Sequence, residues 1–515
     1  MTPPRRSLPG LFTDPPRPWH LLLTPAIPLL GMLKDVLGFV PATVIVLPLA
    51  VAITLSLVLA AVLLPLGADR HRSALAVSLL TLTGISYMTI TLPVSAVAPP
   101  AAVALVYAVV VLGAIKLLRT AGSAAVLTVT ANRAVAIAVV LLTLPILWSE
   151  WRRPTTTVAP LEIPSARSAR PDVYVIVLDG YGRADVLREL FGFENDLVPV
   201  LRANGFFVGD RAAANYSQTA LSLASALNVE YLAALGPVVR NRTDRRGLGD
   251  LINDSRFFRA FADAGYSIRS YSSEYSLVRP RTADDRPSPL GHLNDFSFTV
   301  YETTIVPTLL DAVGLERGAV PMRLHRRHIT WTLDHLTNSA SFGPMPALVF
   351  AHVLAPHPPF VFDANGGPRR SRMPALLGDG DLWRRMALST GEDYKSGYVD
   401  AVRALNARLI AMLKAIDARD RKSIVLIHGD HGPGAGLDWE HPDRSDMRER
   451  MAILAAVRFP DGELPPLDQG SSPVNLYRAV INRALGARLP TIENKSFHST
   501  WERPFDLIDV TGRLN

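Results

Sequence analysis

The amino-acid sequence predicts a multi-span helical membrane domain followed by an extracytoplasmic α/β domain with a largely parallel central sheet. Within the first 150 residues, the tracts 36–68 and 73–115 carry no charged side chain, and a helix needs about 20 apolar residues to cross a bilayer. After residue 170, short apolar runs alternate with stretches of helical period, which is the pattern of an α/β domain. We therefore expect a membrane domain at 1–150, a tether at 151–170 and the α/β domain at 171–515.

Composition limits the chemistry and the partners. The chain has no cysteine, which excludes disulfides, thiolate zinc sites and cysteine nucleophiles, so a metal must be held by Asp, Glu, His or hydroxyl groups. Charged residues make up only 19% of the 515 residues. Residues 1–150 hold nine Lys or Arg against four Asp or Glu, while the remainder is nearly balanced. A basic excess confined to the apolar half indicates membrane topology and no nucleic-acid partner.

The membrane domain is expected to have about five spans. The candidates are 19–33, 43–66, two within 73–115 that are separated by a turn at Pro99 and Pro100, and 134–149, which ends in the interfacial anchors Trp148 and Trp151. With five spans, three basic clusters fall on one side: Arg5, Arg6 and Arg17; Arg70 and Arg72; Lys116, Arg119 and Arg133. The positive-inside rule then places the N-terminus in the cytoplasm and everything after residue 150 outside.

The outer domain shows the alternation of an α/β fold. Apolar runs at 173–178, 348–354, 424–427 and 452–457 are expected to be strands, 268–271 is a further strand candidate, and 255–264 and 394–416 have a helical period. Ligands bind beyond the carboxyl ends of the strands in such sheets. Polar residues at these ends are therefore candidates for a site.

Two of these strand ends carry potential metal ligands. Asp179 follows the run at 173–178, although such a residue on its own is more often a turn or cap aspartate. Asp430 and His431 lie in the segment His-Gly-Asp-His-Gly at 428–432. Adjacent side chains of a strand point to opposite faces, so the two share a metal only if the backbone turns, which Gly429 and Gly432 permit. A capping role is the alternative.

A third candidate lies at a predicted helix start. Asn-Tyr-Ser-Gln-Thr at 215–219 precedes an apolar helical stretch, with Thr219 near its first turn. A hydroxyl there lies at the positive end of the helix, which stabilises an alkoxide or an incoming anion. An ordinary cap threonine is the equally simple interpretation.

Together these segments resemble the alkaline phosphatase/sulfatase superfamily, and within it the membrane-bound branch of lipoteichoic-acid-synthase-like phospho-transferases. The resemblance covers about 170–500 and rests on the segments VYVIVLDG, NYSQTALSLASALN, HVLAPHPPF and VLIHGDHGPG, in that order. It implies one divalent metal ion (Mn, Zn, Mg or Ca) held by Asp179, Thr219, Asp430 and His431. It also implies Thr219 as the covalent nucleophile and His357 as a substrate-binding residue, with His352 as a weaker candidate for that role.

Two departures qualify the resemblance. The lipoteichoic-acid synthases carry Glu where this chain has Asp179, which leaves the metal preference open. Formylglycine sulfatases need Cys or Ser followed by x-Pro-x-Arg, and Ser217 is followed by neither residue. A sulfatase of that type is therefore disfavoured, although the domain is sulfatase-like.

The resemblance implies an enzyme of the bacterial cell (inner) membrane that moves a phosphoglycerol- or phosphoethanolamine-type headgroup from a membrane lipid to an envelope glycan or lipid. A hydrolase of phosphate or sulfate esters would need the same site, and a non-catalytic envelope binding protein is a third hypothesis. A transporter is disfavoured, because the predicted spans hold almost no interior charge.

Overall fold

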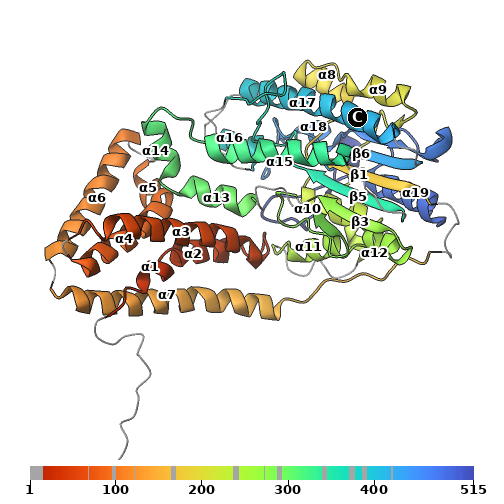
Figure 1. Cartoon of the computed structure of the whole chain (residues 1–515). Helices are drawn as coiled ribbons and strands as arrows, with labels where there is room; N and C mark the ends of the chain where they lie inside the picture. The colour runs from red at the N-terminus through yellow and green to blue at the C-terminus, as the bar shows by residue number, and fades with distance from the viewer. Residues whose placement is uncertain are drawn as a thin grey trace, which may run out of the picture. The chain divides into compact units, whose positions relative to one another are not determined.

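The computed structural model of the chain describes residues 16–67, 69–95, 100–120, 122–163, 170–235, 243–271, 273–286, 293–338, 345–370, 377–385, 391–418 and 422–514. The chain divides into two compact units (Figure 1). The helical unit comprises Met1–Leu37, Ala42–Arg153 and Phe296–Arg317, and the α/β unit comprises Gly38–Pro41, Pro154–Asp295 and Gly318–Asn515. The segment 296–317, which the sequence placed in the α/β domain, thus belongs to the helical unit.

The helical unit is built from short and long helices. They are α1 (His20–Leu23), α2 (Ala26–Val36), the 3-10 turn η1 (Ala42–Ile45) leading into α3 (Val46–Leu63), α4 (Arg70–Ile85), α5 (Tyr87–Ser95), α6 (Pro100–Thr120) and α7 (Ala124–Arg152), with α13 (Asp295–Thr303) and α14 (Val306–Ala312) later in the chain.

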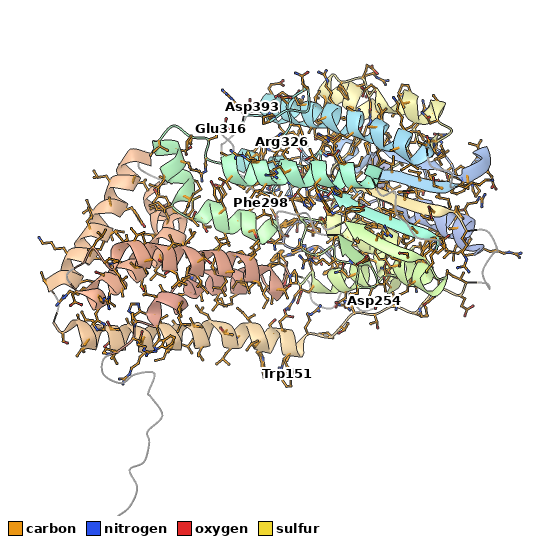
Figure 2. The ribbon with its side chains drawn as sticks, viewed as in Figure 1. Trp151, Asp254, Phe298, Glu316, Arg326 and Asp393 are labelled. Atoms are coloured by element: carbon orange, nitrogen blue, oxygen red, sulfur yellow. The ribbon has the colours of Figure 1, made fainter. Side chains whose placement is uncertain are left out.

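Two helices of the described residues are long and apolar enough to cross a membrane, Ala42–Leu63 and Ala124–Arg152. Only 11% of the most apolar window of the second is buried, whereas the core helix of a water-soluble protein would be covered. Trp148 and Trp151 lie exposed near its C-terminal end, as expected for interfacial anchors; Figure 2 labels Trp151 at that end of α7. The helix Ala124–Arg152 therefore presents an apolar surface, which suggests membrane anchoring.

The other predicted spans differ from expectation. The first candidate is split into α1 and α2, and the first half of 73–115 is split near Ser86 into α4 and α5, while Ala102–Leu118 forms a shorter apolar helix. Pro99, Arg5, Arg6 and part of the tether (164–169) lie outside the described residues. The count of five spans stays a prediction.

Pro25 breaks the helix after α1, because it has no N–H to donate to the Leu21 carbonyl, and polar contacts with other helices hold α1 in place. The His20 ring nitrogen Nδ1 lies 2.6 Å from the Ser78 hydroxyl, and the His20 backbone N–H donates to Asn132 Oδ1 at 2.9 Å. The Ser56 hydroxyl donates to the Leu21 carbonyl. Non-helical backbone in an apolar environment must find such partners, so α3, α4 and α7 hold this short helix in place.

The α/β unit contains a seven-stranded sheet in the order β2-β7-β6-β1-β5-β3-β4. Its parallel strands are β6 (Ser423–Gly429), β1 (Asp172–Leu178), β5 (Ala347–Val353), β3 (Ser267–Tyr271) and β4 (Asp284–Arg286). β7 (Ala455–Arg458) pairs antiparallel with β6, and the edge strand β2 (Phe207–Val208) pairs antiparallel with β7. The predicted strands and the largely parallel sheet are confirmed, except that the run at 452–457 begins as a strand only at Ala455 and is antiparallel.

Helices cover both faces of this sheet, as the complete burial of β1 requires (Figure 1). Val173, Val175 and Val177 pack in one core cluster with apolar side chains of α10, α12 and α19. The helices of the unit are α8 (Ala184–Phe191), α9 (Leu197–Ala203), α10 (Thr219–Leu227), α11 (Arg246–Asn253), α12 (Arg256–Asp263), α15 (Ala319–Asn338), α16 (Gly380–Arg385), α17 (Gly391–Asp417), α18 (Met447–Met451) and α19 (Pro473–Leu485); the 3-10 turns η2 (Leu232–Leu235), η4 (Pro460–Gly462) and η5 (Thr511–Arg513) and the small hairpin β8 (Phe497–His498) and β9 (Ile508–Asp509) complete it.

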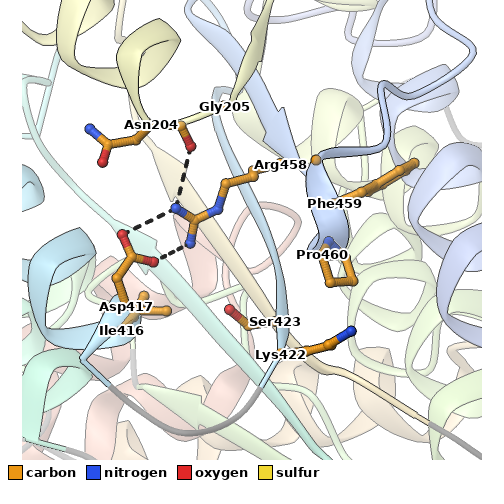
Figure 3. A pocket seen from close by; sticks show the side chains of 10 residues that line it. Asn204, Gly205, Ile416, Asp417, Lys422, Ser423, Arg458, Phe459 and Pro460 are labelled. Atoms are coloured by element: carbon orange, nitrogen blue, oxygen red, sulfur yellow. Dashed lines mark hydrogen bonds and ion pairs between the residues drawn. The ribbon is translucent and has the colours of Figure 1, made fainter.

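A surface pocket of about 290 Å³ lies at the amino-terminal start of β6, the end of the strand opposite to Asp430 (Figure 3). Arg458 reaches across it to Asp417 and to the Asn204 carbonyl. The ion pair joins two of the charged residues that line the pocket, and the pocket lies at the end of β6 opposite to Asp179 and Asp430.

Candidate metal centre

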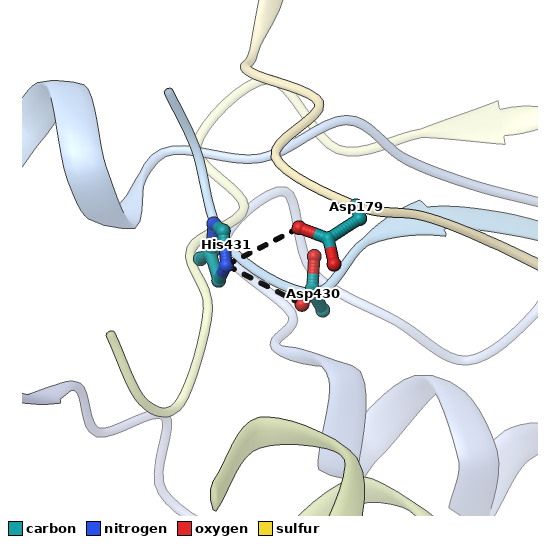
Figure 4. A group of neighbouring side chains, drawn as sticks. All are labelled: Asp179, Asp430 and His431. Carbon is teal, nitrogen blue, oxygen red and sulfur yellow. Dashed lines mark ion pairs between the residues drawn. The ribbon is translucent and has the colours of Figure 1, made fainter. Parts of the chain in front are cut away.

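The sheet brings three potential metal ligands together at its carboxyl edge (Figure 4). Asp179 directly follows β1, and Asp430 and His431 directly follow β6. The two strands are parallel neighbours in which Leu178 pairs with Gly429, so residues some 250 positions apart meet at one point. All three side chains are buried.

The distances within this cluster fit a bound cation. His431 Nε2 lies 3.4 Å from Asp179 Oδ1, 3.5 Å from Asp430 Oδ2 and 3.1 Å from Thr219 Oγ1. Two ligand atoms that each stand about 2 Å from a tetrahedral ion are about 3.3 Å apart. The spacing is therefore that of ligands around one small ion.

Unsatisfied buried atoms also indicate a cation. Asp179 Oδ1 and Asp430 Oδ2 have no hydrogen-bond partner among the described residues. His431 Nδ1 lies 2.9 Å from the Gly432 carbonyl and donates its proton there, so a neutral ring turns the Nε2 lone pair toward the two carboxylates. Three electron-rich atoms that face one another in a buried site repel unless a positive ion lies between them.

The electrostatics keep these groups in the form that binds metal. Burial alone would raise the pKa of Asp179, but the nearby His357, His352 and His431 hold that pKa well below its usual range. Burial, with help from the charge of Arg450, lowers the pKa of His431. A deprotonated carboxylate and a neutral imidazole are the states that a metal ion requires.

Close backbone packing explains the glycines beside the ligands. A Cβ on Gly432 would stand 2.2 Å from the Glu449 carbonyl oxygen, and one on Gly429 would stand 2.5 Å from the Tyr181 carbonyl oxygen. The chain turns after Asp179 at Gly180, whose φ is +77°, and the Gly180 N–H donates to Asp430 Oδ1 at 3.1 Å. The glycines thus provide the room in which adjacent residues can face one ion.

Thr219 is the hydroxyl that reaches the cluster. It is the first residue of α10, and the Ser222 hydroxyl one turn later donates to the Asp430 carbonyl at 2.7 Å, which ties the helix to the metal-ligand loop. The Ser217 hydroxyl is buried and has no hydrogen-bond partner among the described residues. Of the two hydroxyl candidates in the sequence, the fold brings Thr219 beside His431.

The two candidate substrate histidines occupy different places. His357 stands beside the cluster, with its ring centroid 6.3 Å from that of His431 and its Nε2 atom 3.5 Å from Asp379 Oδ1. Burial works against its protonation, yet the carboxylates of Asp179 and Asp379 raise the pKa of His357. His352 instead stands behind Asp179.

His352 contacts Asp179, a candidate metal ligand. Its Nε2 atom lies 3.4 Å from Asp179 Oδ2, and its Nδ1 atom lies 2.8 Å from the Ser273 hydroxyl. The Ser273 oxygen already accepts the Tyr275 N–H at 3.0 Å, which favours donation of its own proton to His352 Nδ1. His352 Nε2–H then faces the carboxylate, an arrangement that orients metal ligands in proteins.

Sequence reasoning missed Asp379, Arg450, His352 as a ligand partner, and Ser273. Arg450 is 2% exposed and forms a bidentate ion pair with Asp379, at 2.9 Å and 3.2 Å. No motif marks these positions in a single sequence. Only the rarity of fully buried arginine would have drawn attention to Arg450, and burial is not visible before the fold is known.

The fold is similar to those of phosphoethanolamine transferases and sulfatases. No protein-family model matches the sequence, and neither does any curated protein. The C-terminal periplasmic domain of EptC from Escherichia coli, in complex with Zn, is 14% identical with a TM-score of 0.42, covering 68% of this chain and 96% of that one. The integral membrane lipooligosaccharide phosphoethanolamine transferase A from Neisseria meningitidis is 12% identical with a TM-score of 0.40, covering 91% and 94%. A 2-O GAG sulfatase is 12% identical with a TM-score of 0.40, covering 67% and 87%.

Proposed function

We propose that this chain is a membrane-anchored, metal-dependent phospho-transferase that uses Thr219 as its nucleophile. The observation that carries the proposal is the buried cluster of Asp179, Asp430 and His431, whose unsatisfied ligand atoms face one point beside the Thr219 hydroxyl. A hydroxyl at a helix start next to a cation site is the arrangement that activates a weak nucleophile.

Asp179, Asp430, His431 and Thr219 would hold one divalent ion, which is Zn, Mn, Mg or Ca. Such an ion lowers the pKa of a hydroxyl beside it and neutralises charge on phosphoryl oxygens. Two carboxylates and one imidazole are a donor set for hard or borderline divalent ions.

The chain's own groups then account for a two-step transfer. The Thr219 oxygen gives up its proton and forms a bond to phosphorus, while the bond from phosphorus to the donor's leaving oxygen breaks and that oxygen takes up a proton, so no net proton is gained or lost. His357, whose charge the Asp179 and Asp379 carboxylates favour, binds the anionic oxygens or the leaving oxygen. In the second step an acceptor hydroxyl oxygen loses its proton and bonds to phosphorus, the bond from phosphorus to the Thr219 oxygen breaks, and the Thr219 oxygen takes up a proton, which restores the enzyme.

The donor and acceptor follow from the proposed setting. The apolar helices of the first unit anchor the site to a membrane, so a lipid headgroup of the phosphoglycerol or phosphoethanolamine type is the donor. An envelope glycan or lipid is the acceptor. We also propose the five-span topology, which places the catalytic domain outside the bacterial cell (inner) membrane.

Trapping the covalent intermediate tests this function. The full chain in detergent micelles is loaded with Zn²⁺ or Mn²⁺ and incubated with phosphatidylethanolamine or phosphatidylglycerol, each labelled in its headgroup. Mass spectrometry should find a phosphoester on the peptide that holds Thr219. Thr219→Ala should abolish the adduct and keep the metal, Thr219→Ser should form some adduct, and Ser217→Ala should match the unmodified protein.

The outcomes separate the alternatives. Label that passes to an added glycan or lipid acceptor supports a transferase, and label released only as a free phospho-headgroup supports a phosphodiester hydrolase with the same site. An adduct on Ser217, or full activity of Thr219→Ala, contradicts the nucleophile assignment. A protein that binds the metal and forms no adduct with either lipid is a binding protein or acts on another ester.

A further inference from the structure

Arg450 contacts the three segments that carry the functional groups. Its Nε atom donates to the Ser217 carbonyl at 2.9 Å, two residues before Thr219. Its Nη1 atom donates to Asp379 Oδ1 at 2.9 Å and lies 3.4 Å from the Gly432 carbonyl, next to His431. Its Nη2 atom donates to Asp379 Oδ2 at 3.2 Å.

Asp379 extends this set of contacts to the substrate histidine. The Asp379 oxygen that accepts from Arg450 Nη1 is also the one that lies 3.5 Å from His357 Nε2. The other nitrogen of the His357 ring lies 2.7 Å from the Pro358 carbonyl. Both edges of the ring therefore have an acceptor, and its orientation depends on where Asp379 is held.

We propose that Arg450 is a positioning residue. Through its contacts with the Ser217 carbonyl, the Gly432 carbonyl and Asp379, it holds Thr219, His431 and His357 in one catalytic geometry. This inference rests on the proposed function. Only a planar guanidinium supplies donors in a fixed fork to three separate segments, whereas an ammonium group has one centre. A buried ion pair adds little to stability on average, so stability alone does not account for this arginine.

The Trp439 ring and the backbone at Gly434 confine the guanidinium of Arg450. Its guanidinium carbon lies 5.1 Å from the centroid of the Trp439 ring. A Cβ on Gly434 would stand 3.2 Å from Arg450 Nη1 and 3.0 Å from Asp379 Oδ1. The pair is confined from two sides, so a movement of Arg450 would be passed to the loops that it holds.

The chain offers a matched control in Arg478. This residue is also buried in the α/β unit, where it donates to the Val229 and Pro490 carbonyls and pairs with Glu230. None of these partners belongs to the metal centre. Arg450→Lys and Arg478→Lys thus remove the same guanidinium fork at sites of similar burial.

The test uses the full chain in detergent micelles with Zn²⁺ as the only metal. Elemental analysis gives the metal content, calorimetry gives the affinity for vanadate as a phosphoryl mimic, and bis(4-nitrophenyl) phosphate reports turnover. Arg450→Lys should keep one Zn²⁺ per chain, bind vanadate at least tenfold more weakly and lower kcat more than it raises KM. Arg478→Lys should stay within twofold of the unmodified protein in vanadate affinity and kcat.

Asp379→Asn keeps the inference testable if Arg450→Lys does not fold. It should weaken vanadate binding at least fivefold, and it should have no further effect in a His357→Ala background. Equal behaviour of Arg450→Lys and Arg478→Lys, or fully additive effects of Asp379→Asn and His357→Ala, overturns the inference alone. An unmodified protein that holds Zn²⁺ but neither binds vanadate nor turns over the diester overturns the proposed function, and the inference with it.

Discussion

Replacing His352 by Gln tests how far the metal centre depends on a residue that does not bind the metal. His352 Nε2 lies 3.4 Å from Asp179 Oδ2, and the Ser273 hydroxyl fixes the other side of the ring. Glutamine has no acceptor atom at the position of the ring nitrogen Nδ1, so it loses the contact with Ser273 that fixes the side chain against Asp179. The Asp179 carboxylate would then be free to rotate away from His431, while all four proposed ligands remain in the chain.

The expected magnitude follows from the linkage between metal binding and folding. A metal at 100 times its Kd stabilises the folded protein by about 2.7 kcal/mol. Loss of such an orienting partner weakens metal affinity about 10–100-fold, so at the same concentration the stabilisation falls to about 1.4 or 0.4 kcal/mol. With a shift of about 2 °C per kcal/mol for a large domain, the metal-induced rise in Tm falls from about 5 °C to between about 1 and 3 °C.

The assay compares the Tm of the same preparation with chelator and with Zn²⁺, followed by tryptophan fluorescence. Taking the difference removes any effect of the substitution on the metal-free fold. His428 is the control, because Val177 pairs with His352 on one side and with His428 on the other, yet the His428 ring faces Tyr477 and the Gly429 carbonyl. An undiminished metal-induced rise in His352→Gln, or an equal reduction in His428→Gln, would refute the role of His352.

Three further predictions concern the centre and the topology. Asp430→Ala removes a charged ligand and should lose the metal equivalent that elemental analysis finds in the unmodified protein; full retention of the metal would mean that the site is wrongly placed. Gly432→Ala places a Cβ 2.2 Å from the Glu449 carbonyl oxygen and should lower both Tm and metal content, whereas Gly192→Ala, at a site with open space but a φ of +62°, should lower Tm and leave the metal content unchanged. A C-terminal alkaline phosphatase fusion should be active and a C-terminal green-fluorescent fusion dark, because the five-span topology puts the C-terminus outside; the opposite pattern would exclude an extracytoplasmic α/β domain.

The sequence by itself determined the local features of the α/β unit. The apolar runs that became β1, β5 and β6 are short, contain β-branched residues and are followed by turn residues, so their type could be read without the fold. The start of α10 at Thr219 was also visible, because the residues before it favour a helix entry. The candidates Asp179, Asp430 and His431 followed from one rule, that polar residues beyond parallel strands form sites.

In the helical unit, hydropathy alone was a weaker guide. Uncharged apolar tracts indicate burial in lipid or protein but do not say where a helix is interrupted. The structure splits these tracts at Pro25 into α1 and α2 and near Ser86 into α4 and α5, and it holds α1 through contacts such as that of His20 with Ser78. These partners come from helices far apart in the chain, so no local pattern reports them.

Only the tertiary structure decided which of the candidate residues meet. β1 and β6 are adjacent although about 250 residues separate them, and that pairing places Asp179 against His431. The tertiary structure also gives the two histidines of the β5 region different partners. His352 lies next to Asp179, a proposed ligand, and His357 lies next to Asp379. No motif in the sequence marks Arg450 and Asp379. Their proposed role depends on the distances between the segments at Ser217, Asp379 and Gly432. Strand order and loop packing determine those distances.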